Sequence, residues 1–181
     1  MVMLSDPSVV LLPLTKQMAK VISKEFIEQL LQEIPDPEIP VISIVDLGIV
    51  RSVILENEKV IINITPTYSG CPAMMAIQKD IVARLKDEGI EHVEVNLVHD
   101  EVWTTDWIND TAKERLREYG IAPPEKSSPD KNLLTGKRSA VACPRCGSIE
   151  TSLISQFGST ACKALYRCES CREPFDYFKC H

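Results

Sequence analysis

The sequence lacks any uncharged apolar run of about 20 residues, the length that a membrane-spanning helix needs. It also lacks a basic residue before Lys16, and two prolines interrupt the apolar stretch MVMLSDPSVVLLPL. A secretory signal combines a basic start with an unbroken apolar run. We therefore expect no membrane span and no secretory signal, and we expect a cytoplasmic protein.

The common catalytic patterns are also missing from the sequence. It contains no Ser-His-Asp arrangement, no phosphate-binding loop and no dinucleotide-binding fingerprint. His92 and His99 lie on or beside a predicted strand, where a histidine is usually structural. Because no acid/base pair or cofactor motif stands out, we expect an accessory protein rather than an enzyme.

Basic residues are too few for a nucleic-acid-binding protein. The chain carries 20 Lys and Arg against 26 Asp and Glu, a formal net charge of −6. The basic excess is confined to residues 137–181, so the rest of the chain is strongly acidic. An acidic surface repels phosphate backbones, and we expect no nucleic-acid partner.

The sequence has no internal repeat, and its composition divides it into four parts. An irregular lead-in covers residues 1–14, and a compact body covers 15–121. A segment rich in proline, serine and charge covers 122–136 and is typical of a linker. Residues 137–181 hold six of the seven cysteines and form a small module. The apolar fraction of 44% is enough for a real core.

Hydrophobic periodicity predicts an α+β body in which a small three-stranded sheet is packed by helices. Pro35 to Pro40 is expected to form a stiff loop, because its prolines exclude a helix or a central strand. The predicted order is α-β-β-α-β-α. Its elements are a helix at 15–34 capped by Thr15, two strands flanking 56–59, a helix at 72–88 ended by Gly89, a strand through 93–97, and a helix at 105–119 capped by Thr105 or Asp106 and ended by Gly120.

Two CxxC motifs in the last module predict a metal site. Cys143 and Cys146 are separated by 21 residues from Cys168 and Cys171. Four thiolates satisfy a tetrahedral ion, and a 45-residue polar module hardly folds without such a staple. Zinc in a closed, structural site is the main interpretation, and iron in the manner of rubredoxin is the alternative. The odd cysteine count and the CxxC spacing argue against a disulfide framework.

Three further residues of this module stay as candidate extra ligands. They are Cys162 and the pair Cys180 and His181. More often such residues serve packing or fray at a terminus, and the ligand interpretation is the weaker one.

Cys71 stands alone, far from the other cysteines, in the stretch TPTYSGCPAMM. Gly70 permits a tight turn, and Pro72 fits the first position of a helix, which puts Cys71 at or near the N-cap. Free N–H groups and the helix dipole there favour an anion, so we expect a stabilised thiolate. The alternative is a small buried hydrophobe, which is what most free cysteines are. Position alone leaves the two interpretations even.

Acidic side chains occupy two nearby loops. Asp36 and Glu38 lie in PDPEIP, and Asp46 lies in VDLGIVR before the first strand. They are candidate polar ligands, although Asp36 and Asp46 also fit as ordinary turn residues.

The stretches DPEIPVISIVDLGIV and ITPTYSGCPAM resemble the SufT-type family of iron–sulfur maturation domains over about residues 24–121. The resemblance implies that Cys71 is the reactive cysteine of a T-x5-C-P motif. It also implies that Asp36, Glu38, Asp46 and Thr65 are the family's other recurring polar positions. With WTTDWI, CPRCGS, FGSTACKALYRC and PFDYFKCH, nearly the whole chain is similar to the phenylacetate-degradation family encoded with the multicomponent phenylacetyl-CoA epoxidase of aerobic bacteria.

This resemblance implies a maturation role in the epoxidase system, with transient iron or an iron–sulfur cluster held at Cys71. The expected partners are the oxygenase and reductase components of the epoxidase or general cluster-assembly proteins, and a homodimer would supply a second Cys71. Two alternatives stay open. In the first, the chain is a bridging subunit that handles no metal at Cys71. In the second, it is a rubredoxin-like electron carrier.

Overall fold

The computed structural model describes residues 22–56, 59–124 and 141–179. Their order confirms the predicted α+β body followed by a small cysteine-rich module. The elements are α1 (Lys24–Gln32), β1 (Val50–Glu56), β2 (Lys59–Ile64), α2 (Ala73–Asp87), β3 (Val93–Leu97), the 3₁₀ helix η1 (Thr105–Trp107), α3 (Asp110–Tyr119), β4 (Ile121–Ala122), β5 (Thr151–Ser155), β6 (Lys163–Cys168) and β7 (Pro174–Phe178).

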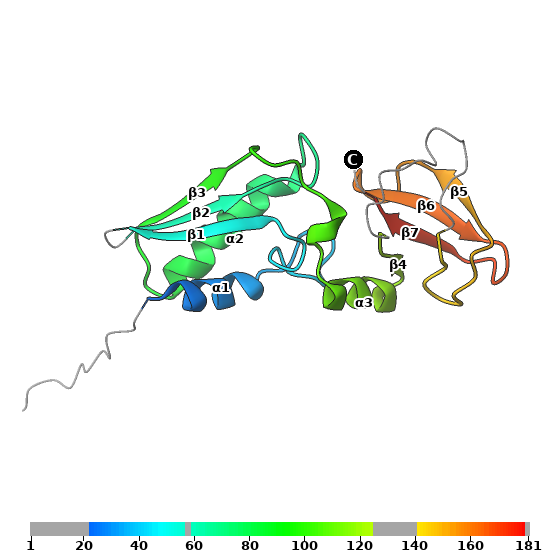
Figure 1. The fold of residues 1–181 in the computed structure, drawn as a ribbon, viewed down its shortest axis with the longest axis horizontal. Helices are drawn as coiled ribbons and strands as arrows, with labels where there is room; N and C mark the ends of the chain where they lie inside the picture. Colours follow the sequence, from blue (N-terminus) through cyan, green and yellow to red (C-terminus); the bar gives the residue numbers. More distant parts are fainter. Residues whose placement is uncertain (1–21, 57–58, 125–140, 180–181) are drawn as a thin grey trace, which may run out of the picture.

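The body contains a three-stranded sheet in the order β1-β2-β3 (Figure 1). β1 and β2 form an antiparallel hairpin in which Glu56 pairs with Lys59. β2 and β3 are parallel and are connected through α2, since parallel neighbours need a crossover. The fully buried Ile62 of β2 packs in one core with Ile77 and Ile81 of α2.

The predicted and observed helix boundaries agree best where a glycine or a proline lies at the boundary. α2 lies within one residue of its predicted range, and Gly89 follows its end with φ +85°. α1 is shorter than predicted, because Ser23 caps it by accepting a hydrogen bond from the N–H of Phe26 at 3.2 Å. The predicted cap Thr15 lies outside the described residues.

The single helix predicted at residues 105–119 is wrong. Thr104 caps η1, and the chain becomes extended at Ile108 before Asn109 caps α3 through the N–H of Ala112 at 2.7 Å. Two capping residues five positions apart therefore start two separate helical segments. Gly120 ends α3 in the left-handed conformation, as expected.

The second sheet has the order β4-β7-β6-β5. β5, β6 and β7 are antiparallel neighbours from the cysteine-rich module, which we call the ribbon (residues 141–179). β4 follows α3 directly and pairs in parallel with β7, Ile121 opposite Asp176. Ala122, where the linker was predicted to begin, is therefore a buried strand residue. Most of that predicted linker lies outside the described residues.

Body and ribbon share buried residues at their junction. Cys162 and Phe178 of the ribbon belong to the main core of the body and are 4% and 1% exposed. The Phe178 ring packs edge-on against Trp103, with 5.9 Å between the ring centroids. Figure 1 shows the two sheets next to each other, with α3 and β4 leading from one to the other.

None of the helices in the described part of the chain has both the length and the apolar character that crossing a membrane requires.

Candidate functional site

The two CxxC motifs bring four sulfur atoms together. The Sγ atoms of Cys143, Cys146, Cys168 and Cys171 all lie within 4.8 Å of one another. Cys143 and Cys171 are 3.8 Å apart, and Cys146 and Cys168 are 3.5 Å apart. Four gathered thiols form a closed tetrahedral donor set of the kind that structural zinc sites use. The sequence prediction of a four-cysteine cluster therefore has the geometry that it needs.

Each CxxC motif turns in the same way. The residue after the second cysteine has a positive φ in both, +74° at Gly147 and +67° at Arg172. Within the second motif, the N–H of Cys171 donates to Sγ of Cys168 at 3.4 Å. That contact contributes most to lowering the pKa of Cys168 to about 6. The backbone therefore favours the thiolate at Cys168. At Cys171 the N–H of Glu173 lowers the pKa, but desolvation and the other three cysteines outweigh it and raise the pKa to about 12.

Cys71 lies in the loop between β2 and α2. Gly70 before it has φ +83°, and Pro72 after it occupies the N-cap of α2. The N–H of Cys71 donates to the carbonyl of Tyr68 at 3.3 Å, and its own carbonyl accepts from Met74 at 3.4 Å. These contacts hold the partly buried thiol just ahead of the first turn of α2, as the sequence predicted.

The expectation of a stabilised thiolate at Cys71 is wrong for this conformation. Burial raises the pKa of the Cys71 thiol, and the negative charges of Glu38 and Asp36 raise it further. The N–H of Ala73 and the hydroxyl of Tyr68 act in the opposite direction but are outweighed. The helix terminus lowers the pKa of Cys71 as expected, but desolvation raises this pKa by more. In this conformation the thiol form of Cys71 is therefore favoured.

The PDPEIP loop brings its two acidic residues to Cys71. One oxygen of Asp36, Oδ1, accepts from the N–H groups of Glu38 at 2.9 Å and Ile39 at 2.8 Å. This Asx-type turn fixes the loop, and burial raises the pKa of Asp36. Asp36 is thus the turn residue that the alternative interpretation expected. Its charge also acts on Cys71, so the loop contributes to the site as well.

The ribbon reaches the same loop. The Cys162 thiol donates to Oε2 of Glu38 at 3.3 Å and contacts Oγ1 of Thr160 at 3.0 Å. Lys163, only 5% exposed, donates from Nζ to the carbonyl of Glu38 at 3.4 Å. Burial raises the pKa of Cys162 to about 12, so it is a protonated donor here.

Cys162 does not join the four-cysteine cluster among the described residues, so its place as an extra ligand there has no support from the geometry. Cys180 and His181, the other extra ligands considered, lie outside the described residues. Sequence reasoning missed Lys163 entirely, because a lysine on a short strand carries no signal that it will be buried against another module.

Asp46 serves a different part of the body. Its carboxylate accepts from Nδ2 of Asn109 at 2.8 Å, from Nη1 of Arg115 at 3.1 Å and from the N–H of Ser43 at 3.4 Å. Burial alone raises its pKa, but hydrogen bonds from Gln32, Asn109 and Ser43 more than compensate, and the net pKa is lowered. Asp46 therefore ties its loop to the start of α3.

The backbone at position 48 of the same loop requires a glycine. Its φ is +69°, and a Cβ atom on it would lie 2.6 Å from Cβ of Trp107. Only glycine fits both conditions. The DLG motif thus allows the loop to pack closely against η1. Nε1 of Trp103 also donates to the carbonyl of Leu47 at 2.9 Å, which holds the loop in place.

A hollow of about 430 Å³ lies beside the Cys71 loop. It is lined by Thr65, Tyr68 and other residues of the loop together with His99 and Trp103. Thr65 is buried, and its N–H donates to the carbonyl of Ile49 at 2.9 Å. Thr65 therefore forms part of the lining of this hollow, which does not include Cys71 itself.

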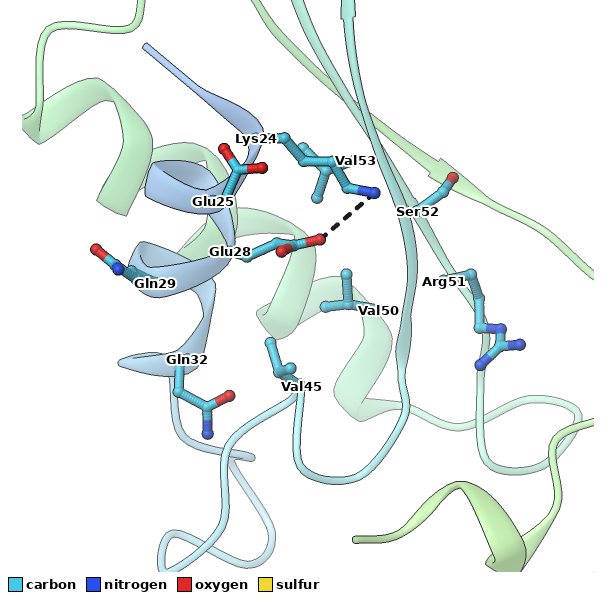
Figure 2. A pocket seen from close by; sticks show the side chains of 10 residues that line it. All are labelled: Lys24, Glu25, Glu28, Gln29, Gln32, Val45, Val50, Arg51, Ser52 and Val53. Carbon is cyan, nitrogen blue, oxygen red and sulfur yellow. Dashed lines mark ion pairs between the residues drawn. The ribbon is translucent and has the colours of Figure 1, made fainter. Parts of the chain in front are cut away.

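A larger hollow of about 580 Å³ lies between α1 and β1. Figure 2 shows its long polar side chains, with the 3.7 Å ion pair between Lys24 and Glu28, which both belong to α1. Its lining contains none of the predicted site residues. Charged, uncharged polar and apolar side chains all contribute to its lining, and we assign this hollow no chemistry.

Comparison with known proteins recovers both parts of the chain. Residues 24–97 match the family model described as iron–sulfur cluster assembly protein, and residues 127–179 match the PaaD zinc beta ribbon domain. The body and site thus define a class, an iron–sulfur cluster assembly domain followed by a zinc ribbon.

The chain is 56% identical over 151 residues to an Escherichia coli K12 protein that is named as a subunit of 1,2-phenylacetyl-CoA epoxidase. The match covers 83% of this chain and 89% of the relative. The chain belongs to the PaaD family.

More distant relatives match the body alone. A Porphyromonas gingivalis protein named as an Fe-S protein maturation auxiliary factor is 29% identical over 92 residues, which cover 50% of this chain and 87% of that protein. A solved domain of unknown function from Bacillus anthracis is 31% identical, with a TM-score of 0.48. The match covers 51% of this chain and 90% of the Bacillus anthracis chain. A conserved hypothetical protein from Thermotoga maritima is 29% identical, with a TM-score of 0.47, and the match covers 55% and 98% of the two chains.

Proposed function

We propose that this protein is an accessory maturation factor of the phenylacetyl-CoA epoxidase system, and that it delivers iron or an iron–sulfur cluster to an epoxidase component through Cys71. The observation that carries the proposal is the Cys71 site itself, a partly buried thiol flanked by Tyr68, Glu38 and Asp36. The E. coli relative named as an epoxidase subunit supports the system, and the family match of residues 24–97 supports the chemistry.

Cys71 is suited to cargo that must leave again. A thiolate is a soft ligand that binds ferrous iron and iron–sulfur clusters. One thiolate leaves other positions on the metal free for a donor or a client, whereas four thiolates close a site. Because burial raises the pKa of the thiol, binding of iron requires release of its proton. Glu38 and Asp36 are close enough to influence the thiol by their charges, and they are the nearby acceptors for that proton.

The four-cysteine cluster has a separate, structural role in this proposal. It holds one zinc ion with Cys143, Cys146, Cys168 and Cys171, and the ion stabilises the ribbon. The ribbon is then a docking module for the partner, which is an epoxidase component or a cluster-assembly protein.

The test is a strain that lacks the protein, complemented with either the wild type or Cys71→Ala. The epoxidase is purified from each strain, and its specific activity and iron content are measured. We expect Cys71→Ala to give no more activity than the strain without the protein, while its own fold and zinc content are unchanged. Ser69→Ala, an exposed position of the same loop, is the matched control and is expected to complement fully. Fully active, iron-replete epoxidase from the Cys71→Ala strain would overturn the proposal.

The name of the E. coli relative also favours a second candidate, a bridging subunit that handles no metal at Cys71. That candidate predicts stable co-purification with the epoxidase and no effect of Cys71→Ala. The same complementation experiment therefore decides between the two.

A further inference from the structure

Two cysteines of the described residues lie outside the four-cysteine cluster, and both interact with Glu38, Cys162 through a hydrogen bond and Cys71 through its charge. Cys71 comes from the body, and Cys162 comes from the ribbon, 91 positions later in the chain. Cys162 donates directly to Oε2 of Glu38 at 3.3 Å. The charge of Glu38 also acts on Cys71, and Cys71 packs against the same core cluster that contains Cys162.

Tyr68 provides a second link between these thiols. Its hydroxyl hydrogen-bonds with the Cys71 thiol, and it lies within electrostatic range of both Glu38 and Cys162. The two modules therefore bring two thiols, a carboxylate and a phenol together at their junction. Packing alone does not require this, because a buried apolar residue at position 162 would fill the same volume without donating to a carboxylate.

We propose that Cys71 and Cys162 are two ligands of one thiophilic divalent-cation site shared by the body and the ribbon, with the Glu38 carboxylate as the third ligand. This inference rests on the proposed function and deepens it. The second thiolate then comes from the same chain, and no second copy is needed to supply it.

The charges of the junction are compatible with such a site. Two thiolates and Glu38 carry three negative charges, and an ionised Asp36, whose charge also acts on Cys71, adds a fourth. A divalent ion cancels two of these charges and the buried ammonium of Lys163 cancels one, which leaves a single negative charge. Each thiol gives up a proton as it binds the ion, so one ion releases two protons. Burial raises the pKa of both thiols, and the affinity for the ion is therefore expected to rise with pH.

The site is not a preformed cage. Across the described residues, only the four ribbon cysteines have their ligand atoms gathered within 4.8 Å. Cys71 and Cys162 must close around an ion by side-chain rotation, and they separate again when it leaves. A cargo site needs this property, and a structural site avoids it.

Cobalt(II) titration of the zinc-loaded full chain under anaerobic conditions tests the proposal. The near-ultraviolet sulfur-to-cobalt absorption scales with the number of bound thiolates, and zinc release is followed to exclude exchange at the cluster. We expect the wild type to bind one additional cobalt with two-thiolate intensity and to release about two protons. Cys162→Ser and Cys71→Ser are each expected to halve the absorption, release about one proton and weaken binding at least tenfold.

Controls separate ligation from folding. Cys162→Ala is measured beside Cys162→Ser, and both must retain one zinc and the wild-type near-ultraviolet dichroism. Ser159→Ala, a neighbouring hydroxyl that bonds to Asp176, is expected to titrate like the wild type. Cys180→Ser is also expected to titrate like the wild type. Loss of signal in Cys180→Ser with full signal in Cys162→Ser would overturn the inference.

The remaining outcomes distinguish this inference from the proposed function. If Cys71→Ser abolishes cobalt binding and Cys162→Ser changes nothing, the shared site is wrong and metal handling at Cys71 stands. If neither cysteine variant changes the titration, metal handling at Cys71 fails together with the shared site.

Discussion

At the scale of single residues, Cys71 shows how two opposing effects decide the state of a thiol. The first turn of α2 and Tyr68 favour the thiolate, while burial and the nearby carboxylates favour the thiol and win. A sequence identifies the helix terminus but carries no measure of burial, so the sign of the pKa change could not be predicted from it. The same limit applies to Cys162, whose partner Glu38 lies 124 positions away.

Two substitutions next to Cys71 are predicted to change its reactivity in opposite directions. Tyr68→Phe removes a hydrogen bond that lowers the pKa of Cys71, so alkylation by iodoacetamide at neutral pH is expected to become slower. Glu38→Gln removes a charge that raises this pKa, so alkylation is expected to become faster. The rate at Cys71 is measured by peptide mass spectrometry across pH, with Tyr119→Phe as an exposed control. Equal rates in all variants would contradict this account of the pKa.

At the scale of elements, the loop before β1 is fixed by Gly48 and Asp46. Gly48 allows the loop to pass under η1, and Asp46 connects it to Asn109 and Arg115. The strands, the hairpin and α2 could be predicted from periodicity and from their glycine and proline signals. The break between η1 and α3 could not, because Thr104 and Asn109 each cap a segment and the helical pattern runs through both.

Replacing Gly48 by alanine is predicted to destabilise the body more than the same change at Gly89. Both residues have a positive φ, which costs an alanine about 1 kcal/mol. At Gly48 the new Cβ also meets Trp107 at 2.6 Å, which adds about 1–3 kcal/mol of overpacking, whereas at Gly89 it has no neighbour within 4 Å. Urea unfolding measures the difference. Equal destabilisation of the two variants would show that the contact with Trp107 relaxes without cost.

Asp46→Asn is predicted to destabilise the protein by about 1–3 kcal/mol at neutral pH, because it weakens hydrogen bonds to a buried carboxylate. The pKa of Asp46 is lowered in the folded protein, so its contribution is fully present above the ordinary carboxyl pKa. The contribution is lost as pH falls through the lowered pKa. The difference in unfolding free energy between wild type and variant must therefore shrink in acid. A difference that stays constant down to about pH 3, below the ordinary carboxyl pKa, would contradict the assignment.

At the scale of the whole molecule, the ribbon contributes two residues to the body's core and keeps a smaller core cluster of its own. Phe178 and Cys162 are buried with body residues, and β4 joins the ribbon sheet directly after α3. The sequence predicted a module held by four cysteines and could not predict its docking, since a contact surface between two modules has no periodic pattern. The hydrogen bonds of Cys162 and Lys163 with Glu38 follow from that docking.

Phe178→Ala is predicted to loosen the junction. Removing a fully buried phenylalanine costs about 3–5 kcal/mol, and the lost volume here lies between Trp103 and the ribbon. Hydrogen exchange at the junction is expected to accelerate while one zinc per chain is retained. Phe157→Ala, which changes a largely exposed ring, is the control and is expected to exchange like the wild type. Unchanged exchange in Phe178→Ala would show that the ribbon does not depend on this contact.

The central claim is that the chain has two distinct metal functions, a closed zinc site in the ribbon and a labile iron site at Cys71. The most direct measurement is metal analysis with a visible spectrum of anaerobically purified protein after incubation with ferrous iron, wild type beside Cys71→Ala. We predict about one zinc per chain in both proteins and thiolate-to-iron absorption in the wild type alone. Identical spectra from the two proteins, or iron in place of zinc in the ribbon, would contradict the account.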